Sequence, residues 1–113
     1  MAENKTEIKC PMRFMLQMIG GKWKPLILQQ LKGEKQRFGE LRKLIPEINK
    51  QMLTKNLREL EKDGIVHRKV YAVVPPKVEY SLSTTGLTLI PVLEAMEDWG
   101  QKQISAKVES GNH

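Results

Sequence analysis

A chain of 113 residues with 40% hydrophobic residues has the size of one domain with a modest core. The formal net charge of +6 favours a polyanionic partner, and residues 1–82 carry the excess, with 17 basic and 9 acidic side chains against 2 and 4 in residues 83–113. No apolar run reaches the roughly 18 residues of a membrane helix, and the first residues lack the apolar core of a signal peptide. We therefore expect a cytoplasmic protein that contacts no membrane, and its single cysteine excludes an internal disulfide.

The chain is expected to begin with a flexible segment and two helices. Residues 1–9 are polar and are expected to fray. Residues 10–20 are predicted to form a helix, because Pro11 is favoured at the first helical position and apolar residues follow at helical spacing until two glycines end the pattern. A second helix is predicted from about Lys22 to Leu31. Its expected buried face consists of Trp23, Leu26, Ile27 and Leu31.

Two further helices are predicted to form a helix-turn-helix. The first begins near Phe38, keeps apolar residues at helical spacing, and ends at Pro46. The second is capped by Asn49 and stopped by Gly64, with Ile48 placed to pack on the first turn. So short a turn between two helices is typical of a helix-turn-helix, whose second helix enters the major groove of DNA.

The second helix of this motif has two different faces. Leu53, Leu57 and Leu60 form an apolar stripe that should face a core. The opposite stripe is polar and contains no carboxylate; its residues are Gln51, Thr54, Lys55 and Arg58. A stripe of this kind on a single helix is also compatible with an ordinary solvated face. The segments that follow in the chain favour a surface that binds a polyanion over a solvated face.

After Gly64 the apolar pattern changes to the period of two that is typical of strands. Residues 66–70 and 78–82 alternate, and the proline-rich segment between them is too long for a tight two-residue turn. The expected hairpin carries Arg68, Lys69 and Lys77, so it resembles the wing of a winged-helix domain. The predicted fold is mainly α with a small β-hairpin wing (α+β), a single winged helix-turn-helix domain over residues 1–113.

The last element is predicted to be one long helix over residues 84–104, kinked at Pro91 and followed by a flexible tail over residues 106–113. Its apolar surface exceeds what one small domain can cover, so we expect a second subunit there. The helix at residues 10–20 also carries apolar residues at helical spacing. The candidate interface residues are Met12, Met15, Leu89, Leu93, Met96 and Trp99. A groove between such helices is also a candidate site for an apolar effector.

With these elements in place the sequence resembles the HxlR-type family of bacterial winged-helix transcriptional regulators, which are similar to the MarR type. The resemblance lies in five segments: Cys10–Pro11, IGGKWKPLIL from Ile19, RFGELRKLIPEI from Arg37, MLTKNLRELEKDGIVHR from Met52 and VPPKVEYSL from Val74. The spacing of Gly86, Leu89, Pro91 and Trp99 agrees with it. The resemblance implies a homodimer joined through the helices at residues 10–20 and 84–104. This dimer is expected to bind a palindromic operator in double-stranded DNA, with one recognition helix in each half-site.

The candidate DNA contacts fall into two groups. The recognition helix supplies the expected base contacts, with Arg58 and Lys55 suited to guanine or phosphate, Gln51 to adenine, and Thr54 to a thymine methyl group or a phosphate. Lys50 is placed for a phosphate. Cations elsewhere are expected to contact the DNA backbone or to remain solvated; these are Arg37, Lys43, Arg68, Lys69 and Lys77.

Cys10 is the candidate for redox sensing. It is predicted at a helix N-terminus beside Lys9, an environment that favours a reactive thiol. In some members of the family the cysteine of this Cys-Pro pair senses small electrophiles or oxidants. Because the chain has no second cysteine, the remaining chemistries are alkylation, a mixed disulfide with a small thiol, and a Cys10–Cys10 link across the dimer. The competing interpretation is a small buried residue or a helix cap.

Two other function classes compete with a DNA-binding regulator. A winged-helix module for protein interaction without sequence-specific DNA binding is disfavoured by the basic excess and by the polar stripe without a carboxylate. An enzyme that uses Cys10 as a nucleophile is disfavoured because the pattern places no histidine near it and no phosphate-binding or oxyanion loop is found. No cofactor is predicted, and His67 stands alone in a strand, so no metal site is predicted.

Overall fold

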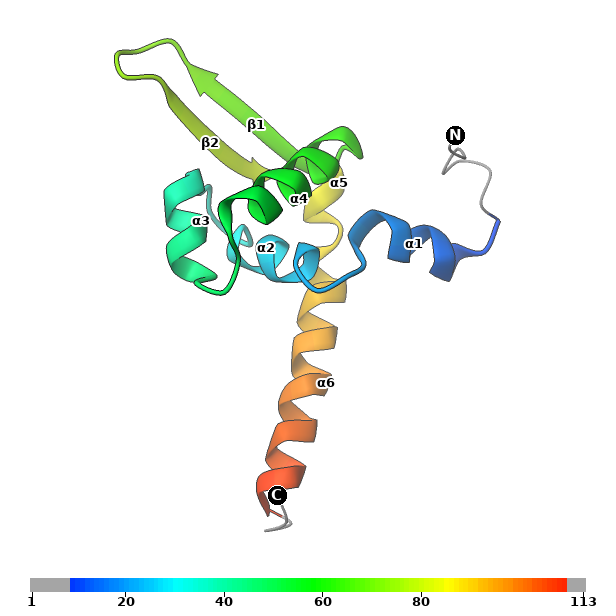
Figure 1. Ribbon diagram of the computed structural model, residues 1–113. Coiled ribbons are helices and arrows are strands. Elements are labelled where there is room, and N and C mark those ends of the chain that lie inside the picture. Colours follow the sequence, from blue (N-terminus) through cyan, green and yellow to red (C-terminus); the bar gives the residue numbers. More distant parts are fainter. Residues whose placement is uncertain (1–8, 110–113) are drawn as a thin grey trace.

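The helix-turn-helix and the wing share one body, from which two helices project (Figure 1). The computed structural model describes residues 9–109. In chain order the elements are α1 (Pro11–Ile19), α2 (Lys24–Gln30), α3 (Phe38–Leu44), α4 (Lys50–Lys62), β1 (Val66–Tyr71), β2 (Lys77–Leu82), α5 (Thr84–Leu87) and α6 (Ile90–Glu109). The predicted winged helix-turn-helix is confirmed. No helix within residues 9–109 is both long enough and apolar enough to cross a bilayer.

Local signals in the sequence set the ends of α3 and α4. Glu40 accepts a hydrogen bond from the backbone N–H of Arg37 (2.7 Å), which holds the first turn of α3. The Asn49 side chain accepts from the backbone N–H of Met52 (2.8 Å), which caps α4. At the other end of α4, Gly64 has a φ of 78°, a left-handed conformation that favours glycine. The predicted cap and stop of the recognition helix are therefore both confirmed.

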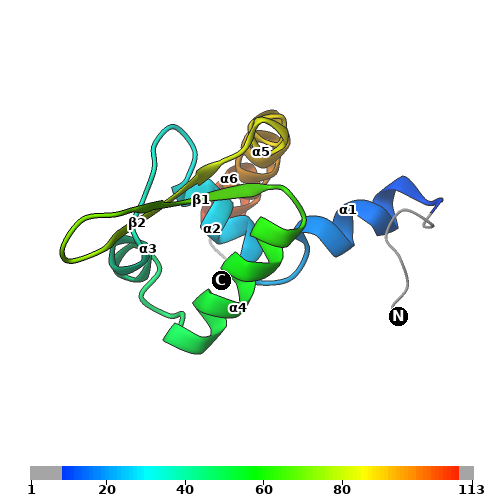
Figure 2. The same ribbon diagram turned by 90° about the horizontal axis from the view of Figure 1, so that it is seen from above.

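The core is built around α2, which has α3, α4 and α6 about it (Figures 1 and 2). Ile27 and Leu28 of α2 are fully buried, whereas Trp23 and Leu26 are only partly buried. The predicted buried face is thus confirmed, since Leu31 is buried too and Trp23 and Leu26 pack against the core, and Leu28 is added to it because neighbours cover α2 on more than one side. The remaining buried apolar residues of the body come mainly from α3, α4 and the first strand: Leu41, Ile45, Ile48, Leu53, Leu57, Leu60, Ile65 and Val66.

The wing is an antiparallel hairpin in which Val66 pairs with Leu82 and Tyr71 with Lys77. Its β2 strand has a second neighbour that the sequence did not reveal. The backbones of Gln36 and Tyr80 exchange two hydrogen bonds of 2.9 and 2.8 Å, so the loop before α3 pairs with the free edge of β2. This pairing fixes the base of the wing to the helix-turn-helix.

The C-terminal segment differs from its prediction in two respects. It is not one kinked helix, because α5 ends at Leu87 and a new helix begins at Ile90. Pro91 therefore occupies the first turn of α6, where its missing N–H costs no hydrogen bond. The helix also continues to Glu109, so residues 106–109, predicted to be flexible, are helical. The other residues predicted to be flexible, apart from Lys9, lie outside the described part.

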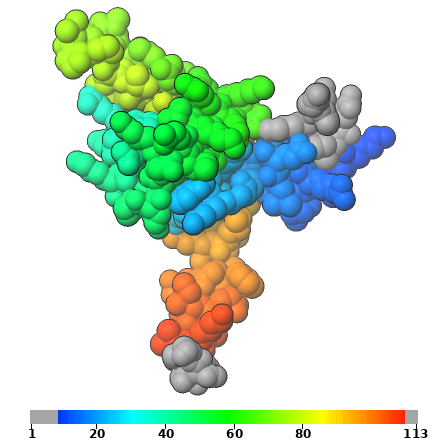
Figure 3. Space-filling view, viewed as in Figure 1, coloured from blue at the N-terminus to red at the C-terminus, as the bar shows by residue number. Residues whose placement is uncertain are grey.

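Helices α1 and α6 project from the body in different directions (Figures 1 and 3). The radius of gyration is 16.2 Å, whereas a compact domain of this length has about 13 Å. Both helices expose large apolar side chains: Met12 of α1 is 60% exposed and Trp99 of α6 is 67% exposed. Both helices are therefore covered only in part within one copy of the chain.

Candidate nucleic-acid interface

The recognition helix α4 presents its polar stripe at the surface, as predicted. Gln51, Lys55 and Arg58 are exposed and Thr54 is half-buried, while the three leucines on the opposite side are buried in the core. The side chains of the stripe border one open hollow together with two neighbours. The lining residues are Lys50, Gln51, Thr54, Lys55, Arg58 and Glu59. The hollow thus offers amide, hydroxyl and cationic groups, the chemistry that reads base edges and phosphates.

One carboxylate borders this hollow, which the sequence did not indicate. Glu59 contacts Lys24 of α2 at 2.7 Å and Lys55 of its own helix at 3.6 Å. The short contact with Lys24 is the main cause that lowers the pKa of Glu59, and the Lys55 charge adds to it. The side chain of Lys24 is only 10% exposed. Glu59 therefore serves as the counter-ion of a nearly buried cation and brings little net negative charge to the surface.

A second hollow of about 370 Å³ lies between α4 and the wing. Arg58 of α4 and Arg68 of β1 both line it. The other lining residues are Phe38, Thr54, Leu57, Glu61 and Tyr80. The predicted wing cation Arg68 is thus brought to the same surface as the recognition helix. Two guanidinium groups, from α4 and from the wing, therefore border the same hollow.

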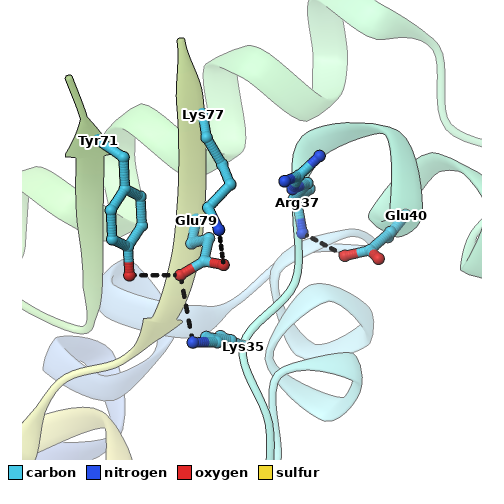
Figure 4. A network of polar contacts seen from close by, with 6 residues as sticks. All are labelled: Lys35, Arg37, Glu40, Tyr71, Lys77 and Glu79. Atoms are coloured by element: carbon cyan, nitrogen blue, oxygen red, sulfur yellow. Dashed lines mark hydrogen bonds and ion pairs between the residues drawn. The ribbon is translucent and has the colours of Figure 1, made fainter. Parts of the chain in front are cut away.

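The other wing cations lie on the opposite face of the hairpin. Residues alternate between the two faces of a strand, so Lys69 and its partner Glu79 point away from the face that carries Arg68. The Lys77 ammonium lies 3.7 Å from Glu79 and 4.6 Å from the centre of the Tyr71 ring. The predicted wing contacts are therefore divided between two faces, and Lys77 is already paired within the chain (Figure 4).

The two candidate cations of α3 are exposed but line neither hollow. Arg37 stands immediately before α3 and Lys43 lies in its last turn. Both lie at the ends of the helix that precedes α4, where contacts to the DNA backbone are expected in a helix-turn-helix. The structure does not bring them together with the side chains of α4.

Cys10 and the candidate interface residues lie on the two projecting helices. Cys10 occupies the N-cap position of α1, as the competing interpretation as a helix cap expects, although its side chain makes no capping hydrogen bond, and it is exposed within one copy of the chain. Among the interface candidates, Met12, Met96 and Trp99 are exposed. Leu93 is buried in the core of its own chain, and Met15 and Leu89 pack against that core. The sequence did not single out other exposed apolar residues on these helices: Leu16, Val92, Ile104 and Val108.

A small hollow lies between α2 and α6, a different place from the groove between the two projecting helices that was predicted for an apolar effector, and the effector site stays a prediction. The volume of the hollow is about 200 Å³, and Met96 is the methionine that lines it. The other lining residues are Pro25, Leu26, Gln29, Leu93 and Glu97.

Comparison with known proteins agrees with this geometry. The profile of the HxlR-like helix-turn-helix family matches residues 18–108. The chain is 57% identical over 93 residues to YdeP, an HTH-type transcriptional regulator of Bacillus subtilis (strain 168), covering 82% of this chain and 73% of the relative. Its structure is similar to that of the redox regulator HypR in its reduced form, with a TM-score of 0.83 and 50% identity over 89% of this chain and 99% of that one. The oxidised form of HypR gives a TM-score of 0.80, with 53% identity over 82% of this chain and 96% of that one.

Proposed function

We propose, from the membership of this chain in the HxlR-like helix-turn-helix family, that it binds a palindromic operator in double-stranded DNA as a homodimer. The relatives in this family are transcriptional regulators, not enzymes. The observation that carries the proposal is the α4 surface, where amide, hydroxyl and cationic groups surround one open hollow in front of a leucine core. In this proposal α4 enters the major groove of each half-site.

Each side chain of the α4 surface has a proposed partner in the groove. Arg58 and Lys55 suit the acceptors of guanine or a phosphate, and Gln51 suits the donor and acceptor pair of adenine. Thr54 contacts a thymine methyl group or a phosphate, and Lys50 a phosphate. Arg68 is added from the wing, because it shares a hollow with Arg58.

Sequence-independent contacts hold the protein on the duplex. Arg37 and Lys43 are exposed and are proposed to contact the DNA backbone, whereas Lys69 lies on the face of the wing opposite Arg68 and is left out of the proposal. Each phosphate that a cation neutralises releases bound counter-ions, so the logarithm of the affinity should fall with the logarithm of the salt concentration by about 0.9 per contact. For a dimer with several such contacts on each half, the affinity for DNA is expected to fall steeply as the salt concentration rises.

The dimer is proposed to form through α1 and α6. Both helices leave the body and expose apolar side chains that one copy does not cover, among them Met12, Leu16, Met96 and Trp99. A two-fold axis between them would place the two α4 helices about one DNA turn apart, roughly 34 Å or a small multiple of it. Operator symmetry then follows from the symmetry of the protein.

The DNA proposal is tested by selecting bound duplexes from a random pool and measuring their affinity by fluorescence anisotropy. We expect a palindromic consensus that binds at least about a thousandfold more tightly than a scrambled duplex of the same composition at physiological salt. Repeating the titration at a second salt concentration should weaken both affinities. Equal affinity for the selected and scrambled duplexes would instead indicate a protein-interaction module.

We also propose that modification of Cys10 alters DNA binding. The thiol is exposed on α1, one of the two proposed dimer helices, so a group added to it lies near the subunit contact. A relative of similar structure is a redox regulator solved in reduced and oxidised forms, which supports the same role here. The proposed product with an electrophile is a thioether. With an oxidant such as diamide, which takes up the two electrons and two protons of two thiols, the proposed products are a mixed disulfide with a small thiol or a Cys10–Cys10 disulfide between subunits.

Intact mass and operator affinity after treatment with a quinone or with diamide test this second proposal. The expected result is a mass increase or a covalent dimer that accompanies a change in operator affinity. Cys10→Ser is the matched control, since it keeps a small polar side chain and loses the thiol. If Cys10→Ser protein responds to the reagents as the wild type does, Cys10 is not the sensor.

A further inference from the structure

The outer face of the wing, defined as the face opposite Arg68, carries a closed set of charges centred on Glu79 (Figure 4). The Tyr71 hydroxyl donates a hydrogen bond to the Glu79 carboxylate at 2.8 Å. Lys35, from the loop before α3, lies 3.4 Å from the same oxygen atom, and Lys77 lies 3.7 Å from the other one. One carboxylate therefore holds two cations from different parts of the chain.

Glu79 is held in its ionised form by these partners. Its side chain is only 12% exposed, and the hydrogen bond from Tyr71 is the main cause that lowers its pKa, followed by the nearby Lys35 and Lys77. The Tyr71 ring contributes as well, because the ammonium groups of Lys77 and Lys69 lie 4.6 and 5.0 Å from its centre. The cations of the outer face are thus already paired within the protein, with the Glu79 carboxylate or with the Tyr71 ring.

The same set of contacts fixes the direction of the wing. Lys35 precedes Gln36, whose backbone pairs with Tyr80 of β2. The ion pair and the backbone pairing lie side by side and join the wing to the start of α3. The outer face is therefore kept turned away from α4, while Arg68 is kept on the hollow shared with Arg58.

We propose that Glu79 is a specificity-determining residue, because it retains Lys35 and Lys77 on the outer face of the wing and keeps their charges from adding to sequence-independent binding of DNA. The proposal rests on the DNA-binding function proposed above. Discrimination between operator and other DNA would then depend on α4 and Arg68, which lie on the opposite side of the wing.

The physical reason lies in the difference between the two kinds of complex. Sequence-independent binding is almost entirely phosphate neutralisation, and the protein can adopt many orientations on the duplex. In the operator complex, base contacts by α4 fix one orientation, in which the outer face of the wing points away from the duplex. Cations released from Glu79 would therefore strengthen the non-specific complexes more than the specific one.

Glu79→Gln tests the proposal, because the amide keeps an acceptor for Tyr71 and loses the charge. The matched control is Glu109→Gln, which removes one negative charge at the far end of α6. Tyr71→Phe is a second control, since it removes the hydroxyl but leaves the carboxylate and both ion pairs. Affinities for the selected operator and for a scrambled duplex are measured by anisotropy over a series of salt concentrations.

For Glu79→Gln we expect the affinity for scrambled DNA at about 0.1 M salt to rise roughly fivefold to tenfold per released cation, with a salt slope steeper by about 0.9. Operator affinity should change less than about twofold, so the ratio of the two affinities falls. Glu109→Gln and Tyr71→Phe should keep the wild-type slope.

Two results would overturn the inference while leaving the proposed function intact. One is a salt slope of Glu79→Gln protein equal to that of the wild type or of Glu109→Gln. The other is the same change of slope in Tyr71→Phe, which would point to a loosened wing instead of released charge. A wild-type protein that does not distinguish operator from scrambled DNA would remove the proposed function itself and this inference with it.

Discussion

Arg58 and Glu59 are neighbours in the chain, but they belong to different contact networks. Successive residues of a helix are turned by about 100°, so Arg58 points to the open surface and Glu59 turns toward α2. Arg58 lines both hollows of the candidate interface, whereas Glu59 pairs with Lys24. Substitutions at these two positions should therefore affect different properties of the protein.

Arg58→Ala is expected to weaken operator binding by about 1–3 kcal/mol and to relax the sequence preference at one position of each half-site. The reason is that Arg58 is exposed and is proposed to contact a base edge, so its loss removes a contact without disturbing the core. Selection from a random pool, together with anisotropy, measures both effects. Lys102→Ala, which removes a cation from α6, should leave the consensus unchanged; if it relaxes the preference equally, Arg58 has no specific role.

Glu59→Gln is expected to lower the free energy of unfolding at neutral pH by about 1 kcal/mol, because a nearly buried Lys24 loses its charged partner and solvent screens the half-exposed carboxylate. The folded-state pKa of Glu59 is lowered, so the unfolded state binds its proton more readily and the stabilisation is present above about pH 4.3.

This contribution should disappear as the pH falls through the lowered pKa of Glu59. Urea denaturation at several pH values measures it as a difference between wild type and Glu59→Gln that shrinks on acidification. Glu61→Gln, which removes a carboxylate from the same helix, is the control and should show a smaller difference at neutral pH. A difference between wild type and Glu59→Gln that does not depend on pH would rule out the ion pair as its cause.

A close backbone contact at Gly86 holds α5 against the residue that precedes the wing. Gly86 of α5 lies against the backbone of Ile65, and a Cβ atom added to it would lie only 2.3 Å from the Ile65 carbonyl oxygen. That oxygen also accepts hydrogen bonds from the backbone N–H of Ser83 (3.0 Å) and from its hydroxyl (3.0 Å). Only glycine fits at this crossing of α5 and the chain before β1.

Gly86→Ala is therefore expected to destabilise the fold by about 2 kcal/mol or more, since backbone atoms must move to admit the methyl group. Gly39→Ala in α3 is the matched substitution, because its Cβ would meet no atom within 4 Å, and it should raise the stability by about 0.5–1 kcal/mol. Thermal unfolding followed by circular dichroism compares the two. Equal melting temperatures would contradict the close contact at Gly86.

The sequence predicted correctly those helix ends that are set by a residue at the end itself, such as a capping side chain, a proline or a glycine. Pro11, Asn49 and Gly64 mark the ends of α1 and α4, and the structure places these ends there. The α5–α6 region was predicted incorrectly, because Pro91 is compatible both with a kinked helix and with the first turn of a new one. Only the packing of α5 against the chain before β1 decides between them.

At the candidate interface the polar stripe of α4 could be predicted, because helical periodicity alone places its side chains on one face. The pairing of Lys24 with Glu59 and that of Gln36 with Tyr80 could not, since both join residues more than thirty positions apart. The division of Arg68 and Lys77 between the two faces of the wing depends on the strand register, which becomes visible only in the structure. Local patterns therefore indicated the surface, and long-range contacts determine which charges remain available on it.

The two projecting helices, α1 and α6, leave large apolar side chains exposed in a single copy of the chain. Trp99 is 67% exposed on α6, and Met12 and Leu16 are exposed on α1. Large apolar side chains exposed together on projecting helices are typical of a subunit interface. The proposed dimer would cover them and would set the distance between the two α4 helices.

Trp99→Glu is expected to convert the dimer to a monomer and to lower operator affinity, because a single α4 surface contacts only one half-site. Sedimentation velocity measures the first effect and anisotropy the second. Val74→Glu is the control, since Val74 is an exposed apolar residue at the tip of the wing, and this protein should remain a dimer. If Trp99→Glu protein sediments as the wild type does, α6 does not form the interface through this residue.

The spacing of operator half-sites tests most directly whether two α4 surfaces read one DNA molecule together. We would measure the affinity of the wild-type protein for the selected palindrome and for the same duplex with five base pairs inserted at its centre, about half a turn of DNA. The insertion should turn the second half-site to the opposite side of the duplex and reduce the affinity to that of a single half-site. Equal affinity for the two duplexes would contradict the proposed dimer on a palindromic operator.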